Sequence, residues 1–146
     1  MLLNCIKILL AMSKSDTEGV DKEVGSQVQL VIYRLPKKNH DAMVQICKQS
    51  NDMFRKYGVL HYEIFQLDNT KSFGEMGMTN IYHTISAAQD EEVWVEFVYY
   101  RDRKHMEEVI AKMEKDEDMG RLYKESLDLI TPGTSFILGE FNRMKI

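Results

Sequence analysis

The sequence contains little of several residue types that mark large classes of protein. Only two cysteines occur among its 146 residues, Cys5 and Cys47, so it has neither a disulfide framework nor the paired spacing of a zinc site. No apolar run approaches the ~20 residues that cross a bilayer. Lys and Arg total 19 against 23 Asp and Glu, a net charge of −4, whereas general nucleic-acid binding needs clustered positive charge. These absences predict a cytoplasmic protein that binds neither nucleic acid nor membrane.

The remaining composition, with 44% hydrophobic and 29% charged residues, is that of one globular domain. Residues 1–25 are predicted to be a flexible or mis-annotated extension, and residues 26–146 the domain. Three alternatives stay open for the apolar stretch from Met1 to Met12: translation that truly starts at Met12, a docking amphipathic helix, or a signal peptide. Because residues 13–26 show no periodicity, we expect deletion of residues 1–25 to leave the fold intact.

Regular patterns begin at Gln27. Val28, Leu30 and Ile32 alternate with other residues as in a half-buried strand, which Pro36 ends. Asn39 is the expected N-cap of a helix with an apolar stripe at spacings of three and four residues, and Gly58 ends it. Further strands are predicted at residues 59–67, 92–100 and 134–141, a second helix after the cap Asp102, and a short helix at 119–129. The charged run at 114–118 is expected to be solvated surface.

This order, β-α-β-β-α-β, predicts an α+β ferredoxin-like fold, in which a four-stranded antiparallel sheet carries its helices on one face. The opposite face then needs a cover. A second copy of the domain would supply it, so we predict a homodimer.

Two blocks of sequence resemble the YbaA-like family of uncharacterised proteins. The first block joins residues 33–38 (YRLPKK) to residues 54–63 (FRKYGVLHYE), and the second begins at residues 99–105 (YYRDRKH). The resemblance extends over residues 27–141. It implies a dimeric α/β barrel made of two ferredoxin-like sheets face to face, and it implies no particular activity.

Strand alternation predicts a candidate site on the concave sheet face away from the helices. Leu60, Tyr62, Ile64, Val93, Val95 and Phe97 are expected to face the helices, and Gln29, Tyr33, His61, Glu63, Trp94 and Glu96 the other side. There His61, Glu63 and Glu96 would be the catalytic acid–base groups, while Tyr33 and Trp94 would form flat walls for a ligand. Alternatively, these polar groups only hydrogen-bond across the dimer interface.

The long segment 68–90 is predicted to be a loop that acts as a lid, with Gly74 and Gly77 as hinges and His83 as a ligand-binding residue. His40 and His105 fall at helix starts and are assigned local structural roles. Cys47 and most of the ten methionines fit apolar stripes, so we expect packing from them rather than metal binding or nucleophilic catalysis. Neither a metal motif nor a cofactor motif occurs in the sequence.

Three functions fit these patterns. The first is a dimer that binds a small molecule on the concave sheet face. The second is an enzyme, such as a cofactor-independent oxygenase or an isomerase, which is suggested only by analogy with related barrels. The third is a non-catalytic structural or interaction dimer.

Overall fold

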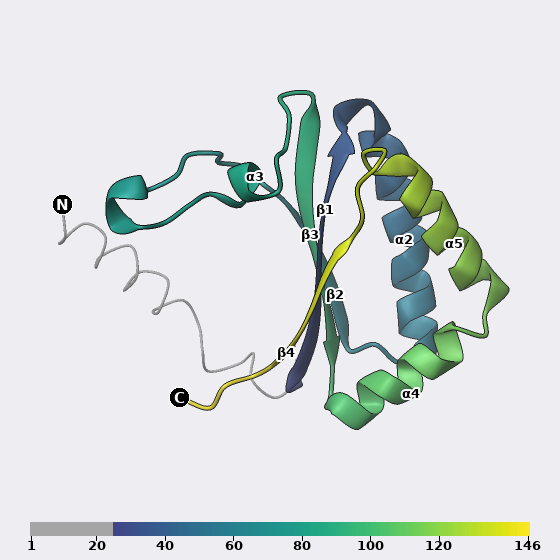
Figure 1. The fold of residues 1–146 in the computed structure, drawn as a ribbon. Coiled ribbons are helices and arrows are strands. Elements are labelled where there is room, and N and C mark those ends of the chain that lie inside the picture. The colour runs from purple at the N-terminus through teal and green to yellow at the C-terminus, as the bar shows by residue number, and fades with distance from the viewer. Residues whose placement is uncertain (1–24) are drawn as a thin grey trace.

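A computed structural model describes residues 25–146 as one four-stranded antiparallel sheet with helices against one of its faces (Figure 1). Its elements are β1 (Gln27–Pro36), α2 (His40–Tyr57), β2 (His61–Gln66), α3 (Ile81–Thr84), β3 (Glu91–Tyr100), α4 (Arg103–Met113), α5 (Glu117–Leu129) and β4 (Ile137–Asn142). The strand order is β2-β3-β1-β4. The predicted ferredoxin-like α+β fold is therefore confirmed, while the predictions for residues 1–24 lie outside the described residues.

Helix α2 forms where its apolar stripe predicts it. Met43, Ile46 and Cys47 are buried against the sheet, and the helix ends at Gly58, whose φ of +92° is easily reached only by glycine. The predicted cap at Asn39 is wrong in detail. A short 3-10 turn at Lys37–Asn39 leads into the helix, and the Asn39 amide instead donates a hydrogen bond to the carbonyl of Leu129 at 2.8 Å.

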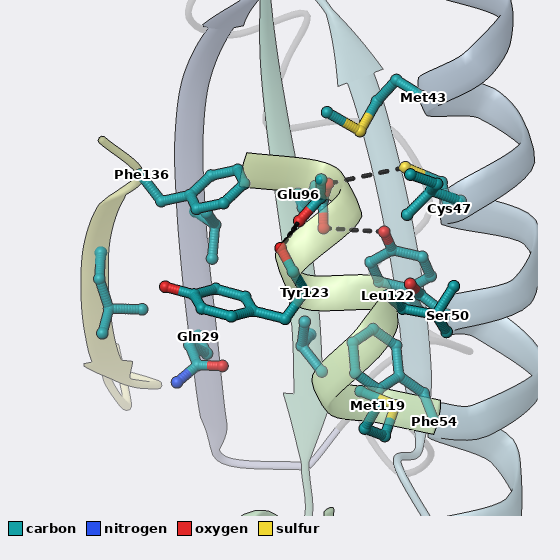
Figure 2. A pocket seen from close by; sticks show the side chains of 16 residues that line it. Gln29, Met43, Cys47, Ser50, Phe54, Glu96, Met119, Leu122, Tyr123 and Phe136 are labelled. Atoms are coloured by element: carbon teal, nitrogen blue, oxygen red, sulfur yellow. Dashed lines mark hydrogen bonds between the residues drawn. The ribbon is translucent and has the colours of Figure 1, made fainter. Parts of the chain in front are cut away.

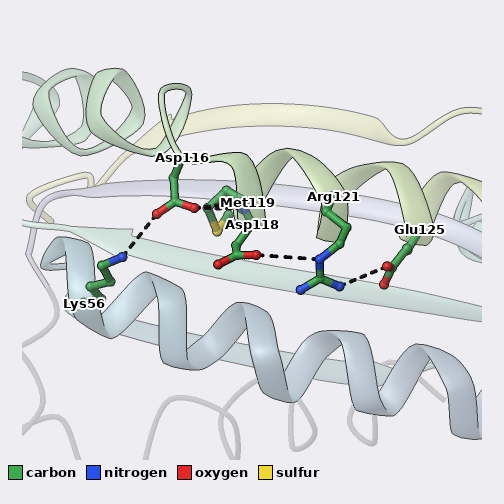
Figure 3. Close-up of polar contacts among 6 residues, drawn as sticks. All are labelled: Lys56, Asp116, Asp118, Met119, Arg121 and Glu125. Atoms are coloured by element: carbon green, nitrogen blue, oxygen red, sulfur yellow. Dashed lines mark hydrogen bonds and ion pairs between the residues drawn. The ribbon is translucent and has the colours of Figure 1, made fainter.

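Helices α4 and α5 both begin at aspartate caps. Asp102 accepts a hydrogen bond from the backbone N–H of His105 at 2.8 Å, as predicted. Asp116 caps α5, so the charged run 114–118 contains a helix start rather than only solvated surface. Its carboxylate also accepts a hydrogen bond from Lys56 Nζ at 3.2 Å (Figure 3). A second one comes from the Tyr57 hydroxyl, and together they tie the start of α5 to the end of α2.

The register between strands decides which side chains share a face, because residues directly opposite in an antiparallel pair point the same way. Tyr33 pairs with Trp94, and Ile64 pairs with Glu96. Together with Tyr62, these side chains lie on the helix face, the side of the sheet that α2, α4 and α5 cover. Its two buried clusters are centred on Tyr33, Leu35 and Trp94 and on Val98, Tyr100 and Met106.

The other side of the sheet, called here the open face, is mostly apolar and only partly covered. The register assigns to it Val28, Leu30, Ile32, His61, Glu63, Phe65, Val93, Val95, Phe97, Tyr99, Ile137 and Phe141. Phe65, Ile137 and Phe141 are 50%, 48% and 52% exposed. The prediction that Val93, Val95 and Phe97 face the helices is therefore wrong.

The segment between β2 and β3 is an arm on the side of the sheet away from the helices (Figure 1). It contains the short turn Gly74–Met76, helix α3 and a bridge between Phe73 and Met78. The Asn80 side chain braces it, since its amide donates to the carbonyls of Asn69 and Lys71 at 2.7 and 3.1 Å. The long loop predicted for residues 68–90 is thus largely confirmed, although it carries local structure of its own.

Candidate functional site

A cavity of about 390 Å³ lies between the sheet, α2 and α5, on the helix face (Figure 2). Sixteen residues line it, and most of them are apolar. Aromatic walls come from Phe54, Tyr62, Tyr123 and Phe136, and α2 and α5 contribute further apolar side chains. This volume lies in the range of small-molecule sites, which combine an apolar wall with a few polar groups.

Glu96 is the charged residue of this wall, and three donors hold it. The Tyr33 hydroxyl donates to Glu96 Oε1 at 2.6 Å, and the Tyr62 hydroxyl donates to Oε2 at 2.8 Å. The Cys47 thiol lies 3.7 Å from Oε1, within its longer hydrogen-bonding range. Both carboxylate oxygens therefore act as acceptors, the pattern of an ionised carboxylate.

Burial shapes the chemistry of these donors. It raises the pKa of the Tyr33 and Tyr62 hydroxyls well above the ordinary value, and the negative charge of Glu96 adds to the effect. Burial also raises the pKa of the Cys47 thiol to about 12, and the negative charge of Glu96 contributes to this shift as well. All three groups thus stay protonated at neutral pH and donate to Glu96, so Cys47 is no thiolate nucleophile.

A smaller cavity of about 210 Å³ lies beside the first, and Cys47 lines both. Glu92 accepts a hydrogen bond from Trp94 Nε1 at 2.8 Å and pairs with His40 Nδ1, also at 2.8 Å. The hydrogen bond to Glu92 raises the pKa of His40. His40 therefore has a structural bond, although it is made to β3 and not within its own helix as predicted.

The structure divides the predicted site residues among three places. Tyr33, Trp94 and Glu96 lie on the helix face, so their assignment to the face away from the helices is wrong, as is that of Gln29, which pairs with Val98. The cause is the register, which places the even-numbered residues of β2 opposite the even-numbered residues of β3, on the helix face.

The other predicted site residues lie elsewhere. His61 and Glu63 are on the open face as predicted, with His61 Nε2 3.1 Å from Glu63 Oε1 and side chains 53% and 37% exposed. The Tyr99 hydroxyl donates to Glu63 Oε2 at 3.1 Å. His83 is exposed on α3, with its ring edge-on to Tyr82. None of these three lines the larger cavity, and the arm lies on the opposite side of the sheet, so it is no lid for that cavity.

Sequence reasoning missed several residues of the cavity. Tyr62 was assigned to the helix side correctly but only as packing, and Cys47 only as core. Met119, Leu122, Tyr123 and Ser126 come from α5, whose apolar periodicity predicts a helix but not what the helix covers. The sequence contains one signal for a polar group on this face. Tyr62 is expected on the helix side with the apolar Ile64, and a buried phenol hydroxyl needs a hydrogen-bond partner there.

Within residues 25–146, no group of three or more His, Cys, Asp and Glu side chains is placed to hold a metal ion. In the same part of the chain, every helix is too short or too polar to cross a membrane.

Comparisons with known proteins give a family and similar solved structures. Among the solved structures, a mutant of SnoaB, described as a cofactor-independent oxygenase from Streptomyces nogalater, aligns with a TM-score of 0.47 and 10% identity. The alignment covers 84% of this chain and 97% of SnoaB. No curated protein matches the chain.

The family model described as "Protein of unknown function (DUF1428)" matches residues 26–128. This agrees with the implication of the resemblance, an uncharacterised family, while the YbaA-like name itself stays a prediction. Because the match spans well over half of the sequence, the chain belongs to the DUF1428 family.

Proposed function

We propose that this protein binds an apolar small molecule in the cavity between the sheet, α2 and α5, with Glu96 as its polar anchor. The observation that carries this proposal is a carboxylate in the wall of an otherwise mainly apolar cavity. Two tyrosine hydroxyls fix the orientation of that carboxylate. Such a wall excludes water from most of a ligand while leaving one position that selects a polar group.

The proposed site lies on the helix face of the sheet, opposite the face predicted from the sequence. Glu96 lines the cavity, and Tyr33 acts through its hydrogen bond to Glu96. The pair of His61 and Glu63 is less suited to enclose a ligand, because both side chains are substantially exposed to solvent.

Filling the cavity tests the proposal. Ser50 lines it, whereas its neighbour Gln49 is exposed on the same helix, so Ser50→Phe and Gln49→Phe form a matched pair. We expect the neutral apolar dye Nile red to bind the wild type and Gln49→Phe, with a rise in fluorescence, and to bind Ser50→Phe at least about tenfold more weakly. Equal binding by all three proteins, or no binding by the wild type, would reject the cavity as the site.

Proton transfer is the second candidate function, and the position of Glu96 favours it. A bound molecule with an acidic C–H group would meet a carboxylate that can accept its proton and return it to another atom, as in an isomerase. Glu96→Gln would then retain Nile red binding but lose solvent-deuterium incorporation into a molecule that co-purifies with the protein. Incorporation at the wild-type rate would assign the proton transfer to another group.

A second copy of this chain is the proposed partner, and it would cover the open face. The exposed apolar side chains of Phe65, Ile137 and Phe141 support this homodimer, since large uncovered apolar patches are typical of interaction surfaces.

The cytoplasmic location also stays a prediction, which rests on the low cysteine content.

A further inference from the structure

Resting on the function proposed above, we infer the charge class of the ligand: an uncharged or cationic apolar molecule that donates a hydrogen bond to Glu96 Oε2. Anionic ligands, such as carboxylates and phosphate esters, would be rejected. The inference rests on which charges line the cavity and on which acceptor positions of Glu96 are already used.

The described wall of the cavity has a single charged residue. Among the described residues that line it, Glu96 carries a negative charge and none is lysine, arginine or histidine. An anion in this cavity would lie near a carboxylate with no cation to compensate it, and repulsion between like charges is strong where water is excluded. A neutral donor or a cation meets no such penalty.

The acceptor positions of Glu96 are unequally used. An ionised carboxylate has about two acceptor positions on each oxygen. Among the described residues, Oε1 receives the Tyr33 hydroxyl and the Cys47 thiol, whereas Oε2 receives only the Tyr62 hydroxyl. One acceptor position on Oε2 therefore remains for a ligand. Oε2 is the oxygen bound by Tyr62, and Tyr62 itself lines the cavity. Figure 2 shows Glu96 at the cavity wall, with its hydrogen bond from Cys47 as a dashed line.

Two other polar side chains of the wall, Ser126 and Gln29, already have partners within the protein. The Ser126 hydroxyl is engaged by the carbonyl of Tyr123 at 2.6 Å, within its own helix. The Gln29 amide lies 3.5 Å from Glu140 Oε1, at the end of the cavity near β4. Aromatic walls at Phe54, Tyr62 and Phe136 add a preference for flat or cationic ligands, since ring faces attract cations.

Four probes with the same apolar body test the inference: propylbenzene, para-propylphenol, para-propylbenzylamine and para-propylbenzoate. Their affinities are measured by calorimetry for the wild type, Glu96→Gln and Glu63→Gln. Glu63 is the matched control, because it is a carboxylate that also accepts a tyrosine hydroxyl but lies on the open face. We expect the phenol, the amine or both to bind the wild type about tenfold or more tightly than the benzoate.

In Glu96→Gln the benzoate should bind as well as the phenol, because the amide can donate to an anion, while Glu63→Gln should keep the wild-type order. Tight binding of the phenol alone or of the amine alone identifies a neutral or a cationic donor and supports the inference. Benzoate binding equal to that of the phenol in the wild type would overturn it, even if Glu96→Gln failed to fold. If none of the four probes and no Nile red bound the wild type, the proposed function itself would fail.

Discussion

At the scale of single residues, the site consists of a carboxylate and the protonated donors that hold it. A carboxylate removed from water needs compensating hydrogen bonds, and Glu96 obtains them from Tyr33, Tyr62 and Cys47. These donors come from β1, β2 and α2, whereas Glu96 belongs to β3. The cluster therefore links three strands to the central helix, and it orients Glu96 before any ligand binds.

The Cys47 thiol should be unreactive in the folded protein. Its pKa of about 12 leaves almost no thiolate at neutral pH, and the thiolate is the nucleophile. We expect iodoacetamide to alkylate Cys47 much more slowly in the native protein than in urea, as followed by peptide mass mapping. The same alkylation rate in both states would show that the thiol is ionised or accessible, contrary to its environment here.

At the scale of elements, α5 completes the cavity, and its N-terminal end is fixed by charge. Asp116 caps the helix and binds Lys56 and Tyr57 of α2. Arg121 bridges Asp118 and Glu125 along the surface of α5 (Figure 3). The two ion pairs of Arg121 are exposed and lie within one helix, and such pairs contribute little to stability. Asp116 is therefore the polar contact that fixes the start of α5 against the end of α2.

Asp116 should make stability dependent on pH in the acid range. Its hydrogen bond from Tyr57 is the main reason that its pKa is lowered to about 2. Because a depressed carboxylate pKa stabilises the fold above the unfolded value of about 3.9, that stabilisation is lost as the pH falls from there toward 2. Asp116→Asn keeps a good cap but removes the charge. We expect it to lower Tm at neutral pH, with the difference from wild type closing in acid.

Asp118→Asn, in the first turn of the same helix, is the control for this measurement. Its side chain is 72% exposed and lies 3.7 Å from Arg121, so its substitution should change Tm little at any pH. A constant difference in Tm between wild type and Asp116→Asn from neutral pH to about pH 2 would contradict the assigned role of Asp116.

At the scale of the whole molecule, the sheet has one covered and one open face. The cavity belongs to the covered face, and the apolar side chains of the open face remain for a partner. Ligand binding and dimerisation are therefore expected on opposite sides of the same sheet. A substitution on one side should leave the function of the other side largely intact, because additivity holds for sites without shared contacts.

Phe65→Lys should convert the proposed homodimer to a monomer. Phe65 is half-exposed on the open face, and its ring centroid lies 5.9 Å from that of Phe97. A charge at this position would disfavour the binding of a second copy of the chain. Sedimentation equilibrium of the wild type at micromolar concentration should give a dimer. Leu127→Lys is the control, because Leu127 is an exposed apolar residue of α5, on the helix face. This variant should remain dimeric. A monomeric wild type, or a dimeric Phe65→Lys, would contradict the open face as the interface.

Local signals were enough for much of the fold. The stripe of α2, its end at Gly58, the cap Asp102 and the stop at Pro36 each depend on a few neighbouring residues. They therefore gave the order of elements and the fold class. Asn39 shows the limit of this reasoning: it has the residue type of a cap, but its amide binds the distant carbonyl of Leu129, which only the packed structure brings close.

The sequence by itself thus determined the elements, their order and the presence of a carboxylate and aromatic side chains in the sheet. Only the tertiary structure decided which face they occupy. Strand β3 is apolar on both sides, with Val93 and Val95 alternating with Trp94 and Val98, so period-two alternation could not distinguish them. The register with β1 and β2, and the helices packed above, placed Glu96 inside a cavity and left His61 and Glu63 on the opposite face.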